Sequence, residues 1–311
     1  MSKNKTKRVA VIDVGTLKSK FEIREFKSDL SSEVLYKDKQ LTVLGRDLDK
    51  TDNIIIENSV QKTIEAIRQF KIKLSEYKVD KYIAVTTEAI RKAKNAISVL
   101  KQIKAETGIS LTTLSHEEEA EIYFRSVSKD FPDNVIAVSD IGGGSVQVVI
   151  GKGKEIYEKY LFKTGTYYLQ EGFSKSHYPT RDEVNAAYKY VKVQLSSLQR
   201  SKYKPALIVY GSTNIIDFLR RMKVDLNKKD THNDHPFSIT VKKLLPLYKK
   251  IISLSYEDRM PMYPEEPYYM WAADKALMNV FTIAEYLKIE EIVPSNNNIS
   301  TGLFLSLQNE K

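Results

Sequence analysis

The sequence predicts an α/β protein made of two lobes, and the two observations behind this prediction are its length and an internal repeat. With 311 residues, the chain is longer than one domain of ordinary size and long enough for two. A strand that ends in aspartate, a glycine turn and a second strand occur twice, at residues 8–23 and 134–151. The two segments, RVAVIDVGTLKSKFEI and NVIAVSDIGGGSVQVVIG, share one plan, and we expect each to open a lobe.

The pattern of the first lobe indicates a mixed α/β unit. Residues 9–13 have no polar face, which indicates a buried strand, whereas residues 20–26 alternate polar and apolar side chains, as a half-buried antiparallel strand does. Apolar residues recur at helical spacing between residues 57 and 77. The other elements predicted for this lobe are strands at residues 34–36, 41–44, 82–85 and 111–114, and a helix at residues 88–103.

The second lobe starts with strands at residues 135–140 and 146–150. Residues 227–236 are polar and are predicted to form a loop, and three prolines between residues 260 and 267 exclude a regular helix there. The remaining elements are predicted to be helices at residues 181–200, 271–287 and 300–307 and strands at residues 207–210 and 289–293. We predict one lobe over residues 1–125, completed by the C-terminal helix at 300–311, and the other over residues 126–299.

Composition excludes several classes of protein. The chain has no cysteine, so disulfides and thiolate metal sites are absent, and no apolar run approaches the ~20 residues that cross a membrane. The basic N-terminus leads directly into a strand rather than into a signal sequence, and we expect a cytoplasmic protein. The net charge of +9 suits a polyanionic partner, but the lysines are scattered without a basic, aromatic stripe, so no specific nucleic acid is predicted.

The two aspartate turns carry the first chemical signal. Gly15 and residues 142–144 allow sharp turns whose backbone N–H groups can converge on phosphate oxygens. Asp13 and Asp140 would repel phosphate unless they hold Mg²⁺ or another divalent cation. Either turn alone is more simply an ordinary hairpin, but two turns in matched context favour phosphate binding.

A second signal lies in the segment Ser115-His116-Glu117-Glu118-Glu119. Ser115 and Glu118 form a capping box, which predicts that a helix begins here. The glutamates could simply complement the helix dipole. Glu119 begins the next turn of the helix, however, and could face a phosphate and deprotonate an attacking water.

Two further segments are less specific. Residues 85–95 predict a strand that feeds a helix N-terminus, where backbone N–H groups and Arg91 can bind an anion. An exposed arginine on an amphipathic helix is an equally good reading of this segment alone. Residues 211–213, Gly-Ser-Thr, form a third small-residue turn after a strand, which by itself is weak evidence for phosphate binding.

Taken together, these motifs resemble the exopolyphosphatase/guanosine pentaphosphate phosphatase (Ppx/GppA) family. The order DVGT, TTEAIRKAKN, SHEEEAEIY, SDIGGGSVQVVIG and GST is similar to the family's D-x-G-S-N-S, A-T-S-A-x-R-x-A-x-N, S-G-x-E-E-A, D-x-G-G-G-S-x-E and G-x-x-G-T. The match extends from about residue 8 to residue 214 and is fainter in EEIVPSNNNISTGLF. The resemblance implies an acetate-kinase/actin-like fold of two ribonuclease H-like lobes with a cleft between them, in a short form without additional C-terminal helical domains.

The resemblance also implies roles for individual residues. Glu119 becomes the general base, and Asp13, Asp140 and Gln147 become the metal-binding residues. The residues implied to bind phosphate are Gly15, Thr16, Lys18, Arg91, Gly143, Gly144, Ser145, Gly211, Ser212 and Thr213. Two departures stand out, because Leu17 and Lys18 replace polar, uncharged residues of the family motif and Gln147 replaces a glutamate. An amide binds Mg²⁺ more weakly than a carboxylate, so the departure at Gln147 predicts an altered metal site, low activity or none.

Three functions are therefore compatible with the sequence. The leading one is a hydrolase that removes terminal phosphate from inorganic polyphosphate, with guanosine pentaphosphate as the second substrate. The first alternative is a sensor that binds polyphosphate or a guanosine nucleotide without hydrolysing it. The second is a phosphotransferase on the same fold, which would need an acceptor site and an adenosine pocket. A homodimer is compatible with each of them.

Overall fold

A computed structural model describes residues 6–27, 31–48, 50–211, 214–229 and 234–309. The chain divides into two compact units, which we call unit 1 (Met1–Ile122 with Ile299–Lys311) and unit 2 (Tyr123–Asn298). The chain passes from unit 1 to unit 2 within helix α4 (His116–Ser128) and returns just before helix α12 (Ile299–Asn309). Each unit is built around a β-sheet of its own.

Unit 1 contains, among its described residues, a five-stranded sheet in the order β3-β2-β1-β4-β5. The first three strands form an antiparallel meander, and β4 and β5 continue the sheet in parallel with β1. The strands are β1 (Lys7–Val14), β2 (Lys18–Phe26), β3 (Ser32–Leu41), β4 (Lys81–Thr86) and β5 (Thr112–Thr113). The helices are α1 (Glu57–Glu76), α2 (Glu88–Lys92), α3 (Ala96–Thr107), the start of α4, and α12.

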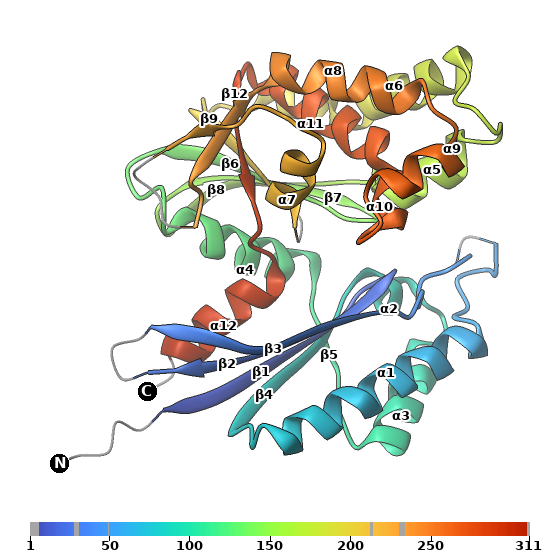
Figure 1. The fold of residues 1–311 in the computed structure, drawn as a ribbon, viewed down its shortest axis with the longest axis vertical. Helices are drawn as coiled ribbons and strands as arrows, with labels where there is room; N and C mark the ends of the chain where they lie inside the picture. The colour runs from blue at the N-terminus through green and yellow to red at the C-terminus, as the bar shows by residue number, and fades with distance from the viewer. Residues whose placement is uncertain (1–5, 28–30, 49, 212–213, 230–233, 310–311) are drawn as a thin grey trace. The chain divides into compact units, whose positions relative to one another are not determined.

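The sheet of unit 1 is covered by helices on both faces (Figure 1). Because successive side chains of a strand point to opposite faces, Ala10 and Ile12 of β1 join the core beneath α1 and α3, whereas Val9 and Val11 pack against α12. Both faces of β1 are therefore buried, which explains why its sequence has no polar alternation until Asp13.

Unit 2 contains, in its described part, a seven-stranded sheet in the order β10-β11-β12-β9-β6-β7-β8. Strands β6, β9 and β12 are parallel to one another, and β7 and β8 extend the sheet as an antiparallel meander. The strands are β6 (Val135–Ile141), β7 (Val146–Lys152), β8 (Glu155–Phe162), β9 (Leu207–Gly211), β10 (Asn227–Lys228), β11 (Phe237–Thr240) and β12 (Glu291–Ser295). Strands β8, β10 and β11 were not predicted, and β10 lies at the start of the segment predicted as a loop, residues 227–236.

Helix α11 (Ala273–Leu287) is central to unit 2, since it contacts α5, α6, α8 and strand β6. Its apolar side chains join one large core with those of the sheet. The other helices of the unit are α5 (Thr166–Phe173), α6 (Arg181–Gln194), η1 (Leu195–Arg200), α7 (Ile215–Arg221), α8 (Val241–Ile252), α9 (Tyr256–Arg259), η2 (Met260–Met262) and α10 (Pro267–Trp271). The helix predicted over residues 271–287 begins at Ala273, two residues later than expected. Helices α5 and α8 were not predicted.

The strand predicted at residues 41–44 is wrong. Strand β3 ends at Leu41, and Val43 has a φ of 47°, in the left-handed region that a strand does not use. The segment instead folds back on the first aspartate turn, where Val43 N–H donates to the carbonyl of Leu17 and Gly45 N–H donates to that of Thr16. Its apolar pattern reflects burial of single side chains, such as that of Leu44, rather than pairing in a sheet.

The helix predicted over residues 88–103 is two helices. α2 ends at Lys92 and α3 begins at Ala96, with Ala93 in an extended conformation between them. The side chain of Asn95 accepts a hydrogen bond from Ile55 N–H and donates one to the Ile55 carbonyl, at 3.0 and 2.9 Å. This contact with a residue 40 positions away interrupts the helix, and helical periodicity alone could not reveal it.

None of the helices in the described segments combines the length and the hydrophobicity needed to span a lipid bilayer.

Candidate active site

The first aspartate turn connects β1 to β2 in unit 1. Gly15 N–H donates to the carbonyl of Lys18 at 3.0 Å, which closes the turn that contains Thr16. Asp13 is buried and lies opposite Lys20 in the β1–β2 register, with Lys20 Nζ 3.8 Å from its Oδ2 atom. Burial raises the pKa of Asp13, and the charge of Lys20 partly offsets this shift. Asp13 therefore already has a cationic neighbour.

Lysines gather on the strands next to this turn. Lys18 and Lys20 lie two residues apart on β2, and Lys39 of β3 lies opposite Lys20. Burial, together with the charges of Lys39 and Lys20, lowers the pKa of Lys18 to about 8. An anion bound here would relieve this repulsion. The sequence reading named Lys18 but missed Lys20 and Lys39, whose shared face follows from strand alternation once the pairing is known.

Arg91 of α2 points into unit 1 rather than into solvent. Its Nη1 atom donates to the carbonyl of Leu114 at 2.5 Å, and its Nη2 atom lies 2.8 Å from Glu119 Oε2 and 3.1 Å from Glu88 Oε2. His116 Nδ1 lies 2.9 Å from the same Nη2 atom. The structure thus brings two predicted site residues, Arg91 and Glu119, into direct contact, and the guanidinium is occupied by protein carboxylates.

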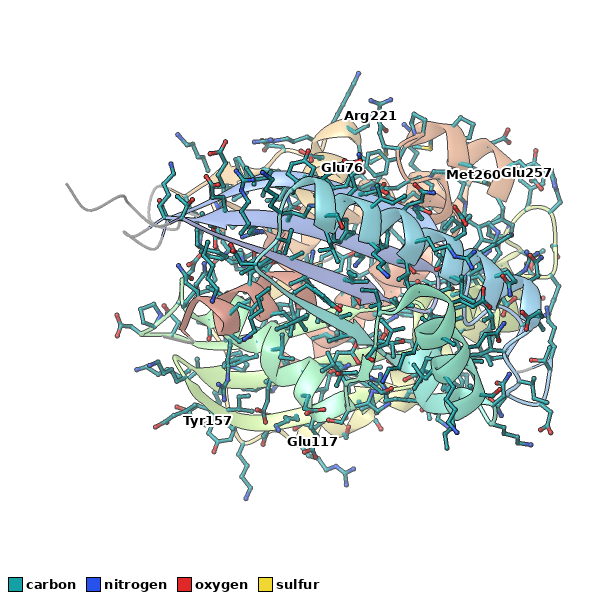
Figure 2. The ribbon with its side chains drawn as sticks, turned by 90° about the horizontal axis from the view of Figure 1, so that it is seen from below. Glu76, Glu117, Tyr157, Arg221, Glu257 and Met260 are labelled. Carbon is teal, nitrogen blue, oxygen red and sulfur yellow. The ribbon has the colours of Figure 1, made fainter. Side chains whose placement is uncertain are left out.

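Helix α4 begins with the predicted capping box. Glu118 N–H donates to Ser115 Oγ at 3.1 Å, and Ser115 N–H donates to Glu118 Oε2 at 2.8 Å, so this prediction is confirmed. Glu117 and Glu118 are exposed, and Glu117 lies at the surface in Figure 2. Glu119 is 8% exposed and faces inward to Arg91. The three consecutive glutamates therefore differ in role, because Glu119 is buried in an ion pair with Arg91 while Glu117 and Glu118 are exposed.

The second aspartate turn connects β6 to β7 in unit 2. Asp140 lies opposite Gln147 in the antiparallel β6–β7 register and beside Gly211 in the parallel β6–β9 register. Directly opposite side chains on neighbouring strands share one face of the sheet. Gln147 is buried, and its Oε1 atom has no hydrogen-bond partner among the described residues. This pair places a carboxylate oxygen and an amide oxygen, both able to bind a cation, on one face of the sheet.

The glycines of this turn are covered by helix α5. Gly142 N–H donates to the Ser145 carbonyl at 3.0 Å, and the carbonyls of Gly142 and Gly143 accept hydrogen bonds from the first N–H groups of α5. A Cβ atom at Gly165 would lie 2.3 Å from the carbonyl carbon of Gly144, so this position requires a glycine. Since the carbonyls face α5, the turn can present N–H groups on its other side. The sequence reading did not single out Gly165.

Gly211 ends β9 between Asp140 and Ser295, its neighbours on the adjacent strands. A Cβ atom here would lie 2.3 Å from Tyr123 Oη and 2.6 Å from the Ser295 carbonyl oxygen, so only glycine fits. Ser212 and Thr213, the other predicted residues of this turn, lie outside the described residues.

A buried polar chain lies behind this part of the site. His235 is fully buried, with Nδ1 2.7 Å from Asp130 Oδ2 and Nε2 2.8 Å from Ser295 Oγ. Burial, followed by the charge of Asp140, raises the pKa of the Tyr123 hydroxyl well above its usual value. Sequence reasoning missed these residues, because no local pattern links positions 105 residues apart.

Among known protein families, the sequence profile of the Ppx/GppA phosphatase family matches residues 24–310 of this chain. The chain belongs to the Ppx/GppA phosphatase family. Its fold is that of solved Ppx/GppA structures. The Aquifex aeolicus family member superposes with a TM-score of 0.81 at 24% identity, covering 99% of this chain and all of that one. An exopolyphosphatase from Cytophaga hutchinsonii superposes with a TM-score of 0.87 at 21% identity, covering 97% and 98% of the two chains. The predicted two-lobed α/β, actin-like fold class is thereby confirmed, while the predicted cleft stays a prediction.

Two curated relatives are longer than this chain. A bifunctional 3-dehydroquinate synthase/phosphatase of Fusobacterium nucleatum is 26% identical over 249 residues, which cover 76% of this chain and 37% of that protein. A guanosine-5'-triphosphate,3'-diphosphate pyrophosphatase of Photobacterium profundum is 28% identical over 139 residues, which cover 44% of this chain and 30% of that protein. The chain thus spans about a third of the length of these two relatives.

The Ppx/GppA chain has residues that fit a divalent cation. In the described segments, no three histidine, aspartate or glutamate side chains gather closely enough to enclose a metal by themselves. Mg²⁺ does not need such a cage, because it keeps several waters and binds through one or two carboxylates together with phosphates. Asp140 and the buried, unbonded Gln147 Oε1 atom fit this type of site, whereas Asp13 already has Lys20 as a counter-ion.

Proposed function

We propose that the protein is a phosphoanhydride hydrolase that releases terminal phosphate from inorganic polyphosphate, with guanosine pentaphosphate as a second substrate. The observation that carries this proposal is the buried carboxylate of Glu119, which forms an ion pair with Arg91 at 2.8 Å. A carboxylate held in this way can accept the proton of a water that attacks phosphorus. The membership in the Ppx/GppA phosphatase family supports the same reaction class.

The lysines of unit 1 favour polyphosphate as the first substrate. Lys18, Lys20 and Lys39 lie on adjacent strand positions, which suits a ligand with a repeated negative charge. Guanosine pentaphosphate is kept as the second substrate because the P. profundum relative is named for a guanosine nucleotide.

Each predicted residue then has a task in binding or in proton transfer. Glu119 would take the proton from water, the glycine turn 142–145 would bind phosphate oxygens through N–H groups, and Lys18 would attract the chain of phosphates. Asp140 and Gln147 would hold Mg²⁺ or another divalent cation. When bound, such a cation neutralises phosphate charge and helps orient the attacking water.

The test is release of phosphate from long-chain polyphosphate, guanosine pentaphosphate and ATP, measured for wild type and Glu119→Gln. We expect hydrolysis of polyphosphate by wild type and a loss of roughly 10²–10⁴-fold in the variant, the usual contribution of general base catalysis. Thermal unfolding of both proteins controls for folding. A Glu119→Gln variant that hydrolyses polyphosphate as fast as wild type would show that Glu119 is only a charge near a helix start.

Gln147 favours one alternative, a polyphosphate or guanosine-nucleotide sensor without turnover. An amide in place of a carboxylate weakens cation binding but leaves anion binding by the turns intact. Binding of polyphosphate without phosphate release, with or without Mg²⁺, would support the sensor. Transfer of phosphate from ATP to an added acceptor would instead support a phosphotransferase.

A further inference from the structure

Three side chains contact one end of the Arg91 guanidinium: Glu119 forms an ion pair with it, and Glu88 and His116 form hydrogen bonds with it. Besides Glu119 Oε2 at 2.8 Å, its Nη2 atom faces Glu88 Oε2 at 3.1 Å and His116 Nδ1 at 2.9 Å. The side chain of Arg91 is 13% exposed, and those of Glu88 and Glu119 are each 11% exposed. Within unit 1, Glu88 and His116 thus contact the same guanidinium nitrogen as the proposed base.

The contact with Arg91 determines the protonation of His116. A guanidinium has only donors, so His116 Nδ1 must accept, and the ring proton is on Nε2. Nε2 lies 3.2 Å from Glu88 Oε2, to which it can donate. The second oxygen of Glu88 binds Lys92 Nζ at 2.7 Å. The geometry therefore requires a neutral His116 that joins Glu88 to Arg91.

We propose that Glu88 and His116 are a pair of positioning residues that hold Arg91 against Glu119, and that protonation of His116 loosens this hold. This inference rests on the proposed role of Glu119 as base. With a proton on Nδ1, two donors and two positive charges would face each other across the 2.9 Å contact with Arg91. The imidazolium would also attract Glu88 more strongly than the neutral ring does, so Arg91 would lose its acceptor at His116, share Glu88 less, and no longer position Glu119.

The charged groups around His116 are Glu88, Arg91 and Lys92 from α2 and, through Arg91, Glu119 from its own helix. Burial, then the charge of Arg91, lowers the pKa of His116 below its ordinary value of 6.5, and the charge of Glu88 opposes this shift. His116 is thus neutral at pH 7, and we expect it to be protonated, and its contact with Arg91 to be lost, below pH 6.5.

The first test needs no activity. Nitrogen NMR of the full chain, which has four histidines, reports the tautomer and the pKa of each ring. His177 is the matched control, since it is 61% exposed and pairs with Glu257 at the surface. We expect His116 to be protonated on Nε2 at pH 7.5 and to titrate below pH 6.5. A His116 that is protonated on Nδ1, or that titrates at or above pH 6.5, would overturn the proposal.

The second test separates positioning from a purely structural role. His116→Asn keeps an acceptor at the place of Nδ1 but cannot titrate, whereas His116→Ala removes the acceptor. For polyphosphate hydrolysis we expect His116→Ala to lower kcat about tenfold with little change in KM, the size of one lost hydrogen bond to a charged group. His116→Asn should restore most of kcat at pH 7.5 and lose less activity than wild type between pH 6.5 and 5.5. His177→Asn should follow the wild-type pH profile.

A His116→Ala variant with the wild-type kcat and pH profile would contradict the positioning role. The same conclusion follows if His116→Asn and His116→Ala are equally impaired. If wild type itself releases no phosphate from any substrate, the proposed function fails, and the tautomer and pKa of His116 alone then decide whether the hold on Arg91 exists.

Discussion

The two aspartate turns share one backbone hydrogen-bond pattern, but the side chains around them differ in charge. In each, the first glycine N–H donates to a carbonyl three residues later at 3.0 Å, from Gly15 to Lys18 and from Gly142 to Ser145. A Cβ atom at either glycine would lie 3.2 Å from that carbonyl oxygen. The repeat recognised in the sequence is thus a repeat of backbone geometry.

The side chains opposite the two aspartates differ. Asp13 lies opposite Lys20, and Asp140 lies opposite Gln147, at equivalent positions of the two hairpins. The first turn therefore combines its carboxylate with cations, while the second offers uncharged and carboxylate oxygens. We propose that the lysines beside the first turn attract phosphate, whereas Asp140 and Gln147 beside the second turn hold the divalent cation.

The largest expected effect contrasts the two aspartates. Asp140→Asn should lower hydrolysis about 100-fold or more and remove its dependence on Mg²⁺, because a bound cation contributes several kcal/mol to the transition state. Asp13→Asn should leave the Mg²⁺ dependence in place and cost less, since the Asp13 carboxylate already has Lys20 beside it. Titration of the rate with Mg²⁺ measures both. Equal loss of Mg²⁺ dependence in the two variants would break the comparison.

The next effect concerns the residue opposite Asp140. Gln147→Glu is nearly isosteric and adds one negative charge next to the proposed cation site. We therefore expect hydrolysis to reach half-saturation at a roughly tenfold lower Mg²⁺ concentration, which corresponds to about 1.4 kcal/mol of cation-binding free energy, and to run faster. Without metal, the added charge should weaken polyphosphate binding. Lys20→Gln, at the equivalent position of the first turn, is the control and should leave the Mg²⁺ requirement unchanged. Unchanged turnover and Mg²⁺ dependence in Gln147→Glu would mean that the amide is not the deficit.

A smaller effect concerns the titration of Lys18. The pKa of Lys18 is lowered to about 8, so Lys18 loses its charge between pH 7 and pH 9. Binding of tripolyphosphate should therefore weaken about tenfold over this pH range. Bound anion raises this pKa, so protons should be taken up on binding near pH 8. Lys18→Arg stays charged and should flatten the profile, which calorimetry at several pH values can measure. A wild-type profile as flat as that of Lys18→Arg would remove Lys18 from the binding site.

The smallest effect tests the shared backbone through stability. Gly15→Ala and Gly142→Ala should each lie within about 0.5 kcal/mol of wild type, because the tight 3.2 Å contact offsets the gain from a stiffer unfolded chain. Gly165→Ala should destabilise by roughly 1–3 kcal/mol, since its Cβ would meet the backbone of Gly144 at 2.3 Å. Denaturant unfolding measures all three. If Gly165→Ala leaves the free energy of unfolding unchanged, α5 does not pack closely against the second turn.

The sequence by itself determined the features that depend on near neighbours. Both aspartate turns, the buried strand before each, and the start of α4 at the capping box of Ser115 and Glu118 are where the residues predict them. Strand alternation, glycine turns and capping boxes involve groups a few residues apart, so their patterns are written directly in the chain. The same holds for the family, which ordered motifs identify without any tertiary information.

Only the tertiary structure decided which charges meet. The sequence offered Arg91 as a phosphate ligand or as an exposed arginine, but the fold directs it to Glu119 and His116. Contacts across tens of residues, such as that of Asn95 with Ile55, likewise split a helix that periodicity predicts as one. Such contacts depend on strand order and helix placement, which no local pattern specifies, and a side chain's charge and pKa follow from them because burial and neighbouring charges set both.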